Sequence, residues 1–129
     1  MTLNKAMRAS STGLAAERFR MDVISSNIAN ANSMRINGVD PYRARKVVLE
    51  GNQDGVRISK VEEDTAPFRR EMDPGNPFAD DEGFVTYSNV EPIVEMVNMM
   101  GASRAYEANI VAFNSARGMV QSALSIGRV

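Results

Sequence analysis

The C-terminal stretch from Val90 to Val129 constrains the fold more than any other part of the chain. Pro92 suits the first turn of a helix, where a missing backbone N–H costs nothing, and no proline follows it. A continuous helix from about Glu91 to Ser125 would be roughly 50 Å long at about 1.5 Å per residue. The average helix has only roughly 11–12 residues. A chain of 129 residues cannot bury so long a helix along its whole length.

Apolar residues occupy most of the circumference of this predicted helix. One stripe consists of Met99, Ala102, Tyr106, Ile110, Phe113, Val120 and Leu124. A second stripe consists of Ile93, Val97, Met100, Ala105, Ala108, Ala112, Ala116, Met119, Ala123 and Ile126. A helix that is apolar on nearly all sides must be buried on nearly all sides. Because one partner helix within the chain cannot cover so much surface, we expect other chains to cover the rest.

The composition excludes several classes of function. There is no cysteine and no histidine, which removes disulfides, thiol chemistry, histidine-based metal sites and the usual general base at neutral pH. A net charge of −1 argues against a nucleic-acid binder that works by phosphate neutralisation. Uncharged runs such as Val97–Ser103 are far shorter than the roughly 20 apolar residues of a membrane span. No apolar core lies between Lys5 and Arg20, so we expect no cleaved Sec-type leader.

A seven-residue repeat runs along the N-terminal part of the chain. Its positions alternate in steps of four and three: Leu3, Met7, Ser10, Leu14, Glu17, Met21, Ile24, Ile28 and Ala31. Most of them are apolar, so the pattern predicts a coiled-coil seam interrupted at Ser10 and Glu17. We expect a soft point or bend at residues 10–13 and the end of the helix between Asn30 and Ser33.

The pattern changes in the middle of the chain, where residues 34–88 carry 19 of the 31 charged side chains and should face solvent. We expect a turn at residues 38–41, a hairpin of strands 42–50 and 56–61 around a loop at 51–55, and two short extended pieces at 66–72 and 83–87. The expected core residues of this β-rich insert are Tyr42, Val48, Leu49, Val56, Ile58, Val61, Phe68, Phe84, Val85 and Tyr87.

Three clusters in the chain could carry chemistry. The acidic run from Asp73 to Glu82 fails the spacing of a calcium-binding EF-hand loop, so we interpret it as a solvated turn. Arg43, Arg45 and Lys46 could contact phosphate, but acidic residues share the insert, which favours a solvated strand face. The third cluster, of methionines near residue 99, favours an adaptable core over a soft-metal site. We expect no cofactor and no metal.

One further pair could help to fix helix register. Arg104 and Glu107 lie three residues apart, where side chains on a helix can pair. In a packed assembly such a pair would demand a partner and would fix register.

Two motifs carry a resemblance to a known family. The segment S-S-N-I-A-N-A-N, at residues 25–32, closes the first helix, and E-M-V-N-M-M-G-A-S-R-A-Y-E-A-N, at residues 95–109, opens the last. With D-P-G-N-P-F-A-D and Y-S-N-V between them, the chain resembles the bacterial flagellar basal-body rod proteins, specifically proximal rod proteins of the FlgC type. The resemblance covers nearly the whole chain. It departs at Ser33–Asn37, where the family commonly has a threonine-rich turn.

The resemblance implies a fold that is mainly α with a small β-rich insert. The long N- and C-terminal helices, residues 1–33 and 90–129, would pair as an antiparallel coiled coil and form one helical domain. Residues 34–89 would form the outer, hairpin-containing insert. The resemblance also implies a structural subunit that polymerises through its terminal helices into the proximal rod, crosses the periplasm and transmits torque from motor to hook.

The implied partners are other rod proteins, further copies of the chain, the adaptor at the rod base and the type III export apparatus. Export from the cytoplasm would use no cleaved signal, and neither membrane insertion nor nucleic-acid binding is implied. The residues expected to mediate assembly lie on both helices: Leu3, Met7, Leu14, Met21, Ile24, Asn27, Ile28, Asn30, Met96, Met99, Met100, Arg104, Tyr106, Glu107, Asn109, Ile110, Phe113, Met119 and Leu124.

Two other classes of protein remain as alternatives. A soluble coiled-coil adaptor would explain the N-terminal seam, but it would not explain a C-terminal helix that is apolar all round. An enzyme would need a general base and a cleft, for which the chain offers no histidine, no cysteine and little mass. We therefore expect no enzymatic activity.

Overall fold

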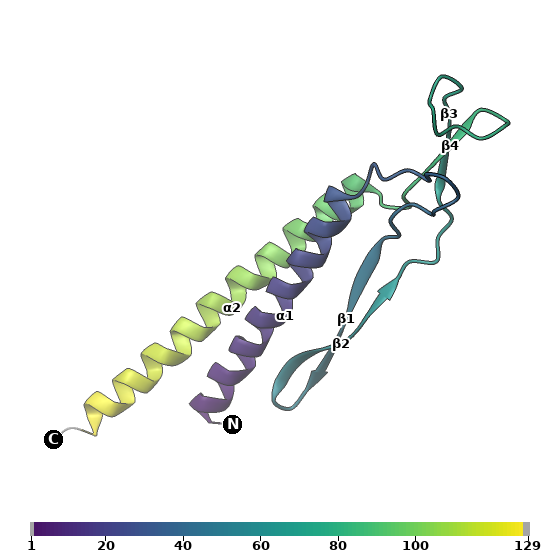
Figure 1. The fold of residues 1–129 in the computed structure, drawn as a ribbon. Helices are drawn as coiled ribbons and strands as arrows, with labels where there is room; N and C mark the ends of the chain where they lie inside the picture. The colour runs from purple at the N-terminus through teal and green to yellow at the C-terminus, as the bar shows by residue number, and fades with distance from the viewer. Residues whose placement is uncertain (1, 128–129) are drawn as a thin grey trace.

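The chain forms a long pair of helices with a β-rich part beside it and at one end (Figure 1). The structure is a computed structural model and describes residues 2–127. Its elements, in chain order, are α1 (Leu3–Ala29), β1 (Arg45–Asn52), β2 (Gly55–Glu63), β3 (Arg69–Met72), β4 (Phe84–Tyr87) and α2 (Pro92–Ile126). The helices run antiparallel and pack along their length. This confirms the predicted fold, mainly α with a hairpin-containing insert.

Helix α1 begins and ends at residues whose side chains satisfy free backbone groups. Thr2 caps the N-terminus, where its hydroxyl accepts a hydrogen bond from the Lys5 N–H at 3.2 Å. At the other end the side-chain amide of Asn30 donates to the Ser26 carbonyl at 2.8 Å. The helix is continuous through residues 10–13, so the expected soft point causes no break.

Helix α2 is unbroken over 35 residues and matches the predicted span to within a residue at each end. Pro92 stands in its first turn, as its fixed φ and missing N–H favour. The predicted residues Arg128 and Val129, like Met1 at the other end of the chain, lie outside the described residues.

The α1–α2 interface follows the seven-residue repeat. On α1, Glu17 and Ile24 are buried, and the other seam positions within the helix are partly buried. Glu17 is tolerated because Arg20 pairs with its carboxylate at 3.3 Å. On α2, Ala102 and Ala116 are buried against α1, and small side chains there let the two backbones approach closely. Ala102 belongs to the first predicted stripe and Ala116 to the second, so α1 packs along the boundary between the two stripes.

The hairpin β1–β2 lies along α1 on the side away from α2 (Figure 1). Its strands pair antiparallel from Arg45↔Glu63 to Asn52↔Gly55, with a register shift between Val48 and Leu49. The prediction that the hairpin residues form a core of their own was wrong. Val48, Leu49, Val56 and Ile58 are only partly buried, and Val61 is exposed. A two-stranded ribbon cannot enclose a core of its own. Its inward side chains therefore pack on α1.

The second sheet, β3–β4, stands near the end of the helix pair and contains the fully buried side chain of Val85. A small apolar cluster of Ala31, Ala44 and Val90, with Tyr42 packed against it, joins this region to both helices. The remaining predicted aromatic core residues lie beneath arginines. The guanidinium carbon is 4.2 Å from the ring centroid for Arg43 over Phe68, 4.4 Å for Arg70 over Phe84 and 5.0 Å for Arg69 over Tyr87.

The segment after α1 turns two residues earlier than expected. Asn37 has φ 50° and Gly38 has φ 78°, and Ile36 and Val39 form an isolated bridge around them. Two successive positive φ angles are typical of a tight type I′ turn, for which Asn-Gly is the preferred pair. The prediction centred on Gly38–Pro41 overlooked this dipeptide.

Candidate assembly surface

Asn27, from the first signature motif, sits where α1, α2 and the start of the hairpin meet. Its side chain is 1% exposed. The amide nitrogen donates to the Arg45 carbonyl at 2.7 Å and to the Glu95 carboxylate at 3.0 Å. The amide oxygen accepts from the Tyr42 hydroxyl at 2.7 Å and from the Arg45 N–H at 3.0 Å. The two donors and two acceptor sites of the amide are thus all used within one subunit.

Asn89, from the Y-S-N-V motif, holds the second junction of the insert. Its oxygen accepts from the Ala44 N–H at 2.7 Å, and its nitrogen donates to the carbonyls of Asp64 and Ala66 at 3.1 and 3.0 Å. Sequence reasoning did not single out this residue. The sequence feature that could have identified it is its position, because it is a single amide residue between a strand and the proline that begins α2.

Arg43 reinforces this second junction, so the prediction of a solvated basic strand face was wrong for that residue. Its guanidinium donates to the Asp64 and Ala66 carbonyls at 2.8 and 2.9 Å. Arg45 and Lys46 are exposed, as expected. Within the basic cluster, Arg43 therefore has a structural role, whereas Arg45 and Lys46 face solvent.

The acidic run is organised around Asp80. Its carboxylate accepts the N–H groups of Phe84 and Glu82, each at 2.9 Å, and the Arg70 guanidinium at 3.0 Å. The hydrogen bond from the Phe84 N–H is the main cause that holds the pKa of Asp80 below its usual 3.8. The Asp80 carboxylate therefore stabilises the surface loop between β3 and β4.

The predicted assembly residues divide into two groups. One group packs within the subunit, buried or partly buried between α1, α2 and the hairpin: Leu3, Met7, Leu14, Met21, Ile24, Asn27, Ile28, Met99, Tyr106, Asn109 and Phe113. The other group is exposed: Asn30, Met96, Met100, Arg104, Glu107, Ile110, Met119 and Leu124. The first group builds the helix pair, and the side chains of the second are exposed as the subunit stands.

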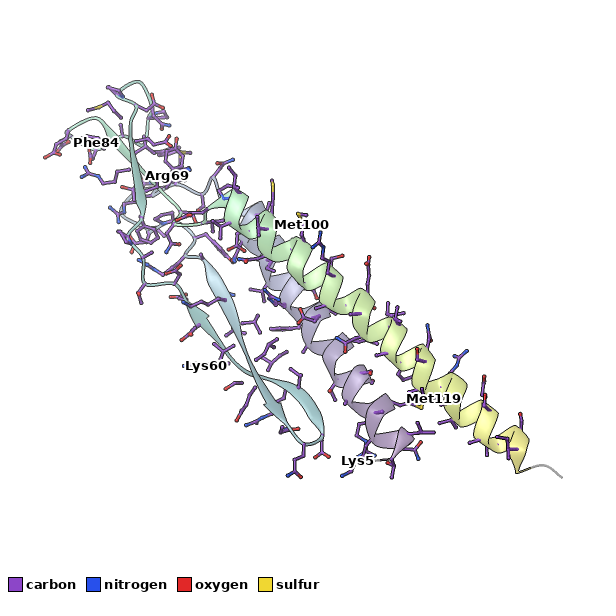
Figure 2. All side chains as sticks on the ribbon, turned by 180° about the vertical axis from the view of Figure 1, so that it is seen from behind. Lys5, Lys60, Arg69, Phe84, Met100 and Met119 are labelled. Carbon is purple, nitrogen blue, oxygen red and sulfur yellow. The ribbon has the colours of Figure 1, made fainter. Side chains whose placement is uncertain are left out.

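Helix α2 carries most of the large exposed apolar side chains of the described chain. Ile93 and Ile126 are each 78% exposed, and Leu124, Val111 and Met119 are 66%, 65% and 58% exposed. Figure 2 shows Met100 on the side of α2 that faces away from α1. So many large apolar side chains exposed along one helix indicate a protein interface. The expected pairing of Arg104 with Glu107 is absent among the described ion pairs, and both side chains are exposed on this same side of α2.

Neither helix offers a membrane-spanning segment, within residues 2–127, because neither combines the necessary length with sufficient apolar character.

Two family models match the two helical parts of the chain. Residues 7–33 match the family described as flagella basal body rod protein, and residues 81–126 match the C-terminal family of the flagellar basal body rod FlgEFG proteins. The chain is also 38% identical to the flagellar basal-body rod protein FlgC of Bacillus subtilis, in an alignment that spans 99% of this chain and all of the relative. The chain belongs to the FlgC family of flagellar basal-body rod proteins.

Other FlgC proteins support this membership. The FlgC of Salmonella typhimurium is 40% identical over 91% of this chain and 92% of its own length, and that of Borreliella burgdorferi is 37% identical over 98% of each. The FlgC family is structural and is not a class of enzymes. As a member, the chain is a structural subunit of the flagellar basal-body rod, and this replaces the alternative of a soluble adaptor.

Proposed function

We propose that this chain polymerises through its two terminal helices into the proximal rod, the drive shaft that transmits torque from the motor to the hook. The observation that supports this most is that large apolar side chains are exposed along nearly the whole length of α2. Each such side chain contributes about 1.5–3 kcal/mol when it becomes fully buried. The free energy of burying these side chains is therefore gained only when neighbouring subunits cover α2.

The rigid junctions at Asn27 and Asn89 fit the same role. A subunit that carries torque must not let its outer insert move independently of its helices. Side-chain hydrogen bonds at these two points connect the insert to α1 and to the start of α2. The exposed group of predicted assembly residues, from Met96 to Leu124, would contact neighbouring subunits, and the buried group would hold the pair of helices in shape.

The proposed partners are further copies of the chain, the other rod proteins, the adaptor at the rod base and the type III export apparatus. The proposed location is the rod within the periplasm, after export from the cytoplasm without a cleaved signal. We propose no catalytic role, since the contacts described above serve structure.

The experiment is a truncation of residues 115–129, which removes the lower part of α2 and keeps Asn109 against α1. We expect loss of rod assembly and of motility, while the insert stays folded, as hydrogen exchange at Val85 would report. Retained motility would refute an assembly role for this end of α2.

A subtler pair of variants separates helix formation from surface chemistry. Replacing Met119, Leu124 and Ile126 with glutamine keeps a good helix former and removes the exposed apolar surface. Replacing Gln121 and Ser122, which are exposed on the same segment, with alanine is the matched control. We expect only the glutamine variant to lose motility.

A further inference from the structure

An open groove follows the α1–α2 interface between the two helices. Its lining comes mainly from α1, including the apolar residues Leu14, Ala15 and Phe19, and α2 contributes Tyr106. Its volume is about 410 Å3. Phe19 is 38% exposed, which is unusual for a large aromatic side chain on a helix already packed on two sides, against α2 and against the hairpin.

Two charged side chains of α1 also line this groove. Arg18 and Asp22 are one helical turn apart and both are exposed. Neither forms an ion pair with another residue of the described chain. The groove therefore presents apolar side chains together with one positive and one negative group, in a fixed order along α1.

The outer side of α2 carries the complementary pattern. Arg104 and Glu107 are exposed and lie between apolar neighbours, with Met100 one turn before them and Val111 one turn after. Within residues 2–127 they too have no ion-pair partner. The separation of this pair along α2, about 4.5 Å, is close to the about 6 Å between Arg18 and Asp22 along α1.

We infer that the groove of one subunit receives the Arg104–Glu107 turn of α2 from a second copy of the same chain, which rests on the proposed polymerisation. In a polymer whose subunits point the same way, α1 of one copy and α2 of the next run antiparallel, as they do within the subunit. Asp22 then meets Arg104 of the second copy, and Arg18 meets its Glu107. Opposite charges would pair at both positions, and Phe19 would gain apolar cover.

This contact has two geometric consequences. The groove and the outer side of α2 are different surfaces, so the contact is head-to-tail and generates a ring or an open helix. Within the subunit, Gly13 lies against Asn109 and Asn27 bonds to Glu95, which puts Asp22 level with residue 100 of α2. Placing Asp22 opposite residue 104 shifts the second copy by about four residues, or about 6 Å, along the axis. A shift of that kind gives an open helix.

The test is a disulfide cross-link, which the absence of natural cysteines makes clean. Asp22→Cys and Arg104→Cys are introduced into two differently tagged copies that are expressed together, and isolated basal bodies are oxidised. We expect a dimer at twice the mass of the chain that carries both tags. Because each copy holds a single cysteine, such a dimer can arise only between subunits.

The matched control pairs Asp22→Cys with Asn114→Cys, which is exposed on α2 about 15 Å further along the helix. We expect no dimer from this pair. Equal cross-linking of both pairs, no cross-link in assembled basal bodies, or a cross-link to a different rod protein would overturn the inference. The first two outcomes leave polymerisation through the helices intact, which the truncation of α2 tests separately.

Charge reversal supplies a second measurement in case the cysteine variants fail to assemble. Asp22→Arg and Arg104→Asp are each expected to reduce motility, since each places like charges opposite one another. The double variant restores the pair with its charges exchanged, so motility should recover. A double variant that swims no better than the worse single variant would overturn the inference.

Discussion

At the scale of single residues, the two asparagines of the signature motifs explain why those motifs are built as they are. A buried side-chain amide whose every donor and acceptor is used specifies one geometry, because any displacement leaves a buried polar group without a partner. Asn27 meets this condition through Arg45, Tyr42 and Glu95. It was predicted as an assembly residue, and the structure gives it an internal role.

We predict that Asn27→Ala lowers the free energy of unfolding by about 3 kcal/mol, because it leaves several buried polar groups without partners. Denaturation of the purified subunit by urea would measure this. Asn30→Ala is the matched control within the same motif, since Asn30 is exposed and its side chain bonds to the Ser26 carbonyl of its own helix. Similar losses for both variants would contradict the role given to Asn27.

We predict that Asp80 stabilises the β3–β4 loop in a way that acid removes. Its pKa is held below 3.8 in the folded state, so its contribution is present above that value and is lost as the pH falls through the lower, folded pKa. Asp80→Asn should therefore be less stable than the natural chain at neutral pH. The difference in urea midpoint should shrink in acid.

The control for this pH dependence is Asp81→Asn. Asp81 is exposed and, in the described structure, receives none of the hydrogen bonds that Asp80 receives. Its substitution should leave the midpoint nearly unchanged at every pH. A difference for Asp80→Asn that persists unchanged in strong acid would contradict the prediction.

At the scale of elements, the hairpin β1–β2 is attached to α1 at a close backbone approach. Gly55 has φ 134°, and a Cβ added there would overlap Thr12 Oγ1 and reach within 3.1 Å of the Ala9 Cα. The Thr12 hydroxyl accepts from the Val56 N–H at 3.1 Å and donates to the Ala9 carbonyl at 2.7 Å. The run that looked like a soft point in the helix is thus the docking site of the hairpin tip.

We predict that Gly55→Ala detaches this tip and costs about 2 kcal/mol, from the strained φ and the lost contact together. Faster hydrogen exchange of the Val56 amide would report the detachment. Gly51→Ala is the control, because a Cβ at Gly51 meets nothing within 4 Å. Unchanged protection of Val56 in Gly55→Ala would show that the tip is held by other contacts.

The elements differ in how far the sequence predicts them, and the reason is the range of the interactions involved. The two helices and the N-terminal seam follow from local periodicity, which the residues of each helix carry themselves. The hairpin follows from glycines at Gly51 and Gly55. The placement of the hairpin on α1, rather than around a core of its own, depends on contacts between Gly55 and Thr12 that no local pattern contains.

The same reasoning applies to the candidate assembly surface. Periodicity predicts that α2 is apolar on two sides, but it does not say which side α1 takes. That choice depends on fit, and the buried Ala102 and Ala116 show that α1 packs on small side chains. Gly13 belongs to the same interface, since a Cβ there would approach the Asn109 side-chain oxygen to 2.7 Å.

At the scale of the whole molecule, the subunit has most of its large exposed apolar side chains on α2 and most of its charged side chains on the insert. We predict that an isolated subunit holds the lower part of α2 weakly and gains helical order there on assembly, because few of its side chains face α1 beyond Ala116. Hydrogen exchange on dilute subunits and on assembled rods would compare the two states.

The control within the same measurement is the β3–β4 sheet, where the Val85 side chain is fully buried and protection should be equal in both states. Protease-resistant termini in a dilute, purified subunit would contradict this prediction. That result would mean that the helix pair alone stabilises α2 to its end.

The unequal lengths of the helices bear on how a stack of subunits resists load. Helix α2 has 35 residues and α1 has 27. They are level where Asn27 meets Glu95, so α2 extends beyond α1 at the opposite end by roughly two turns. At the Asn27 end the two helices stop at nearly the same height, and only at the other end does α2 project. In a stack of such subunits this projecting end of α2 has no helix of its own subunit beside it, so it is the part that can interlock with the next subunit and resist shear between them.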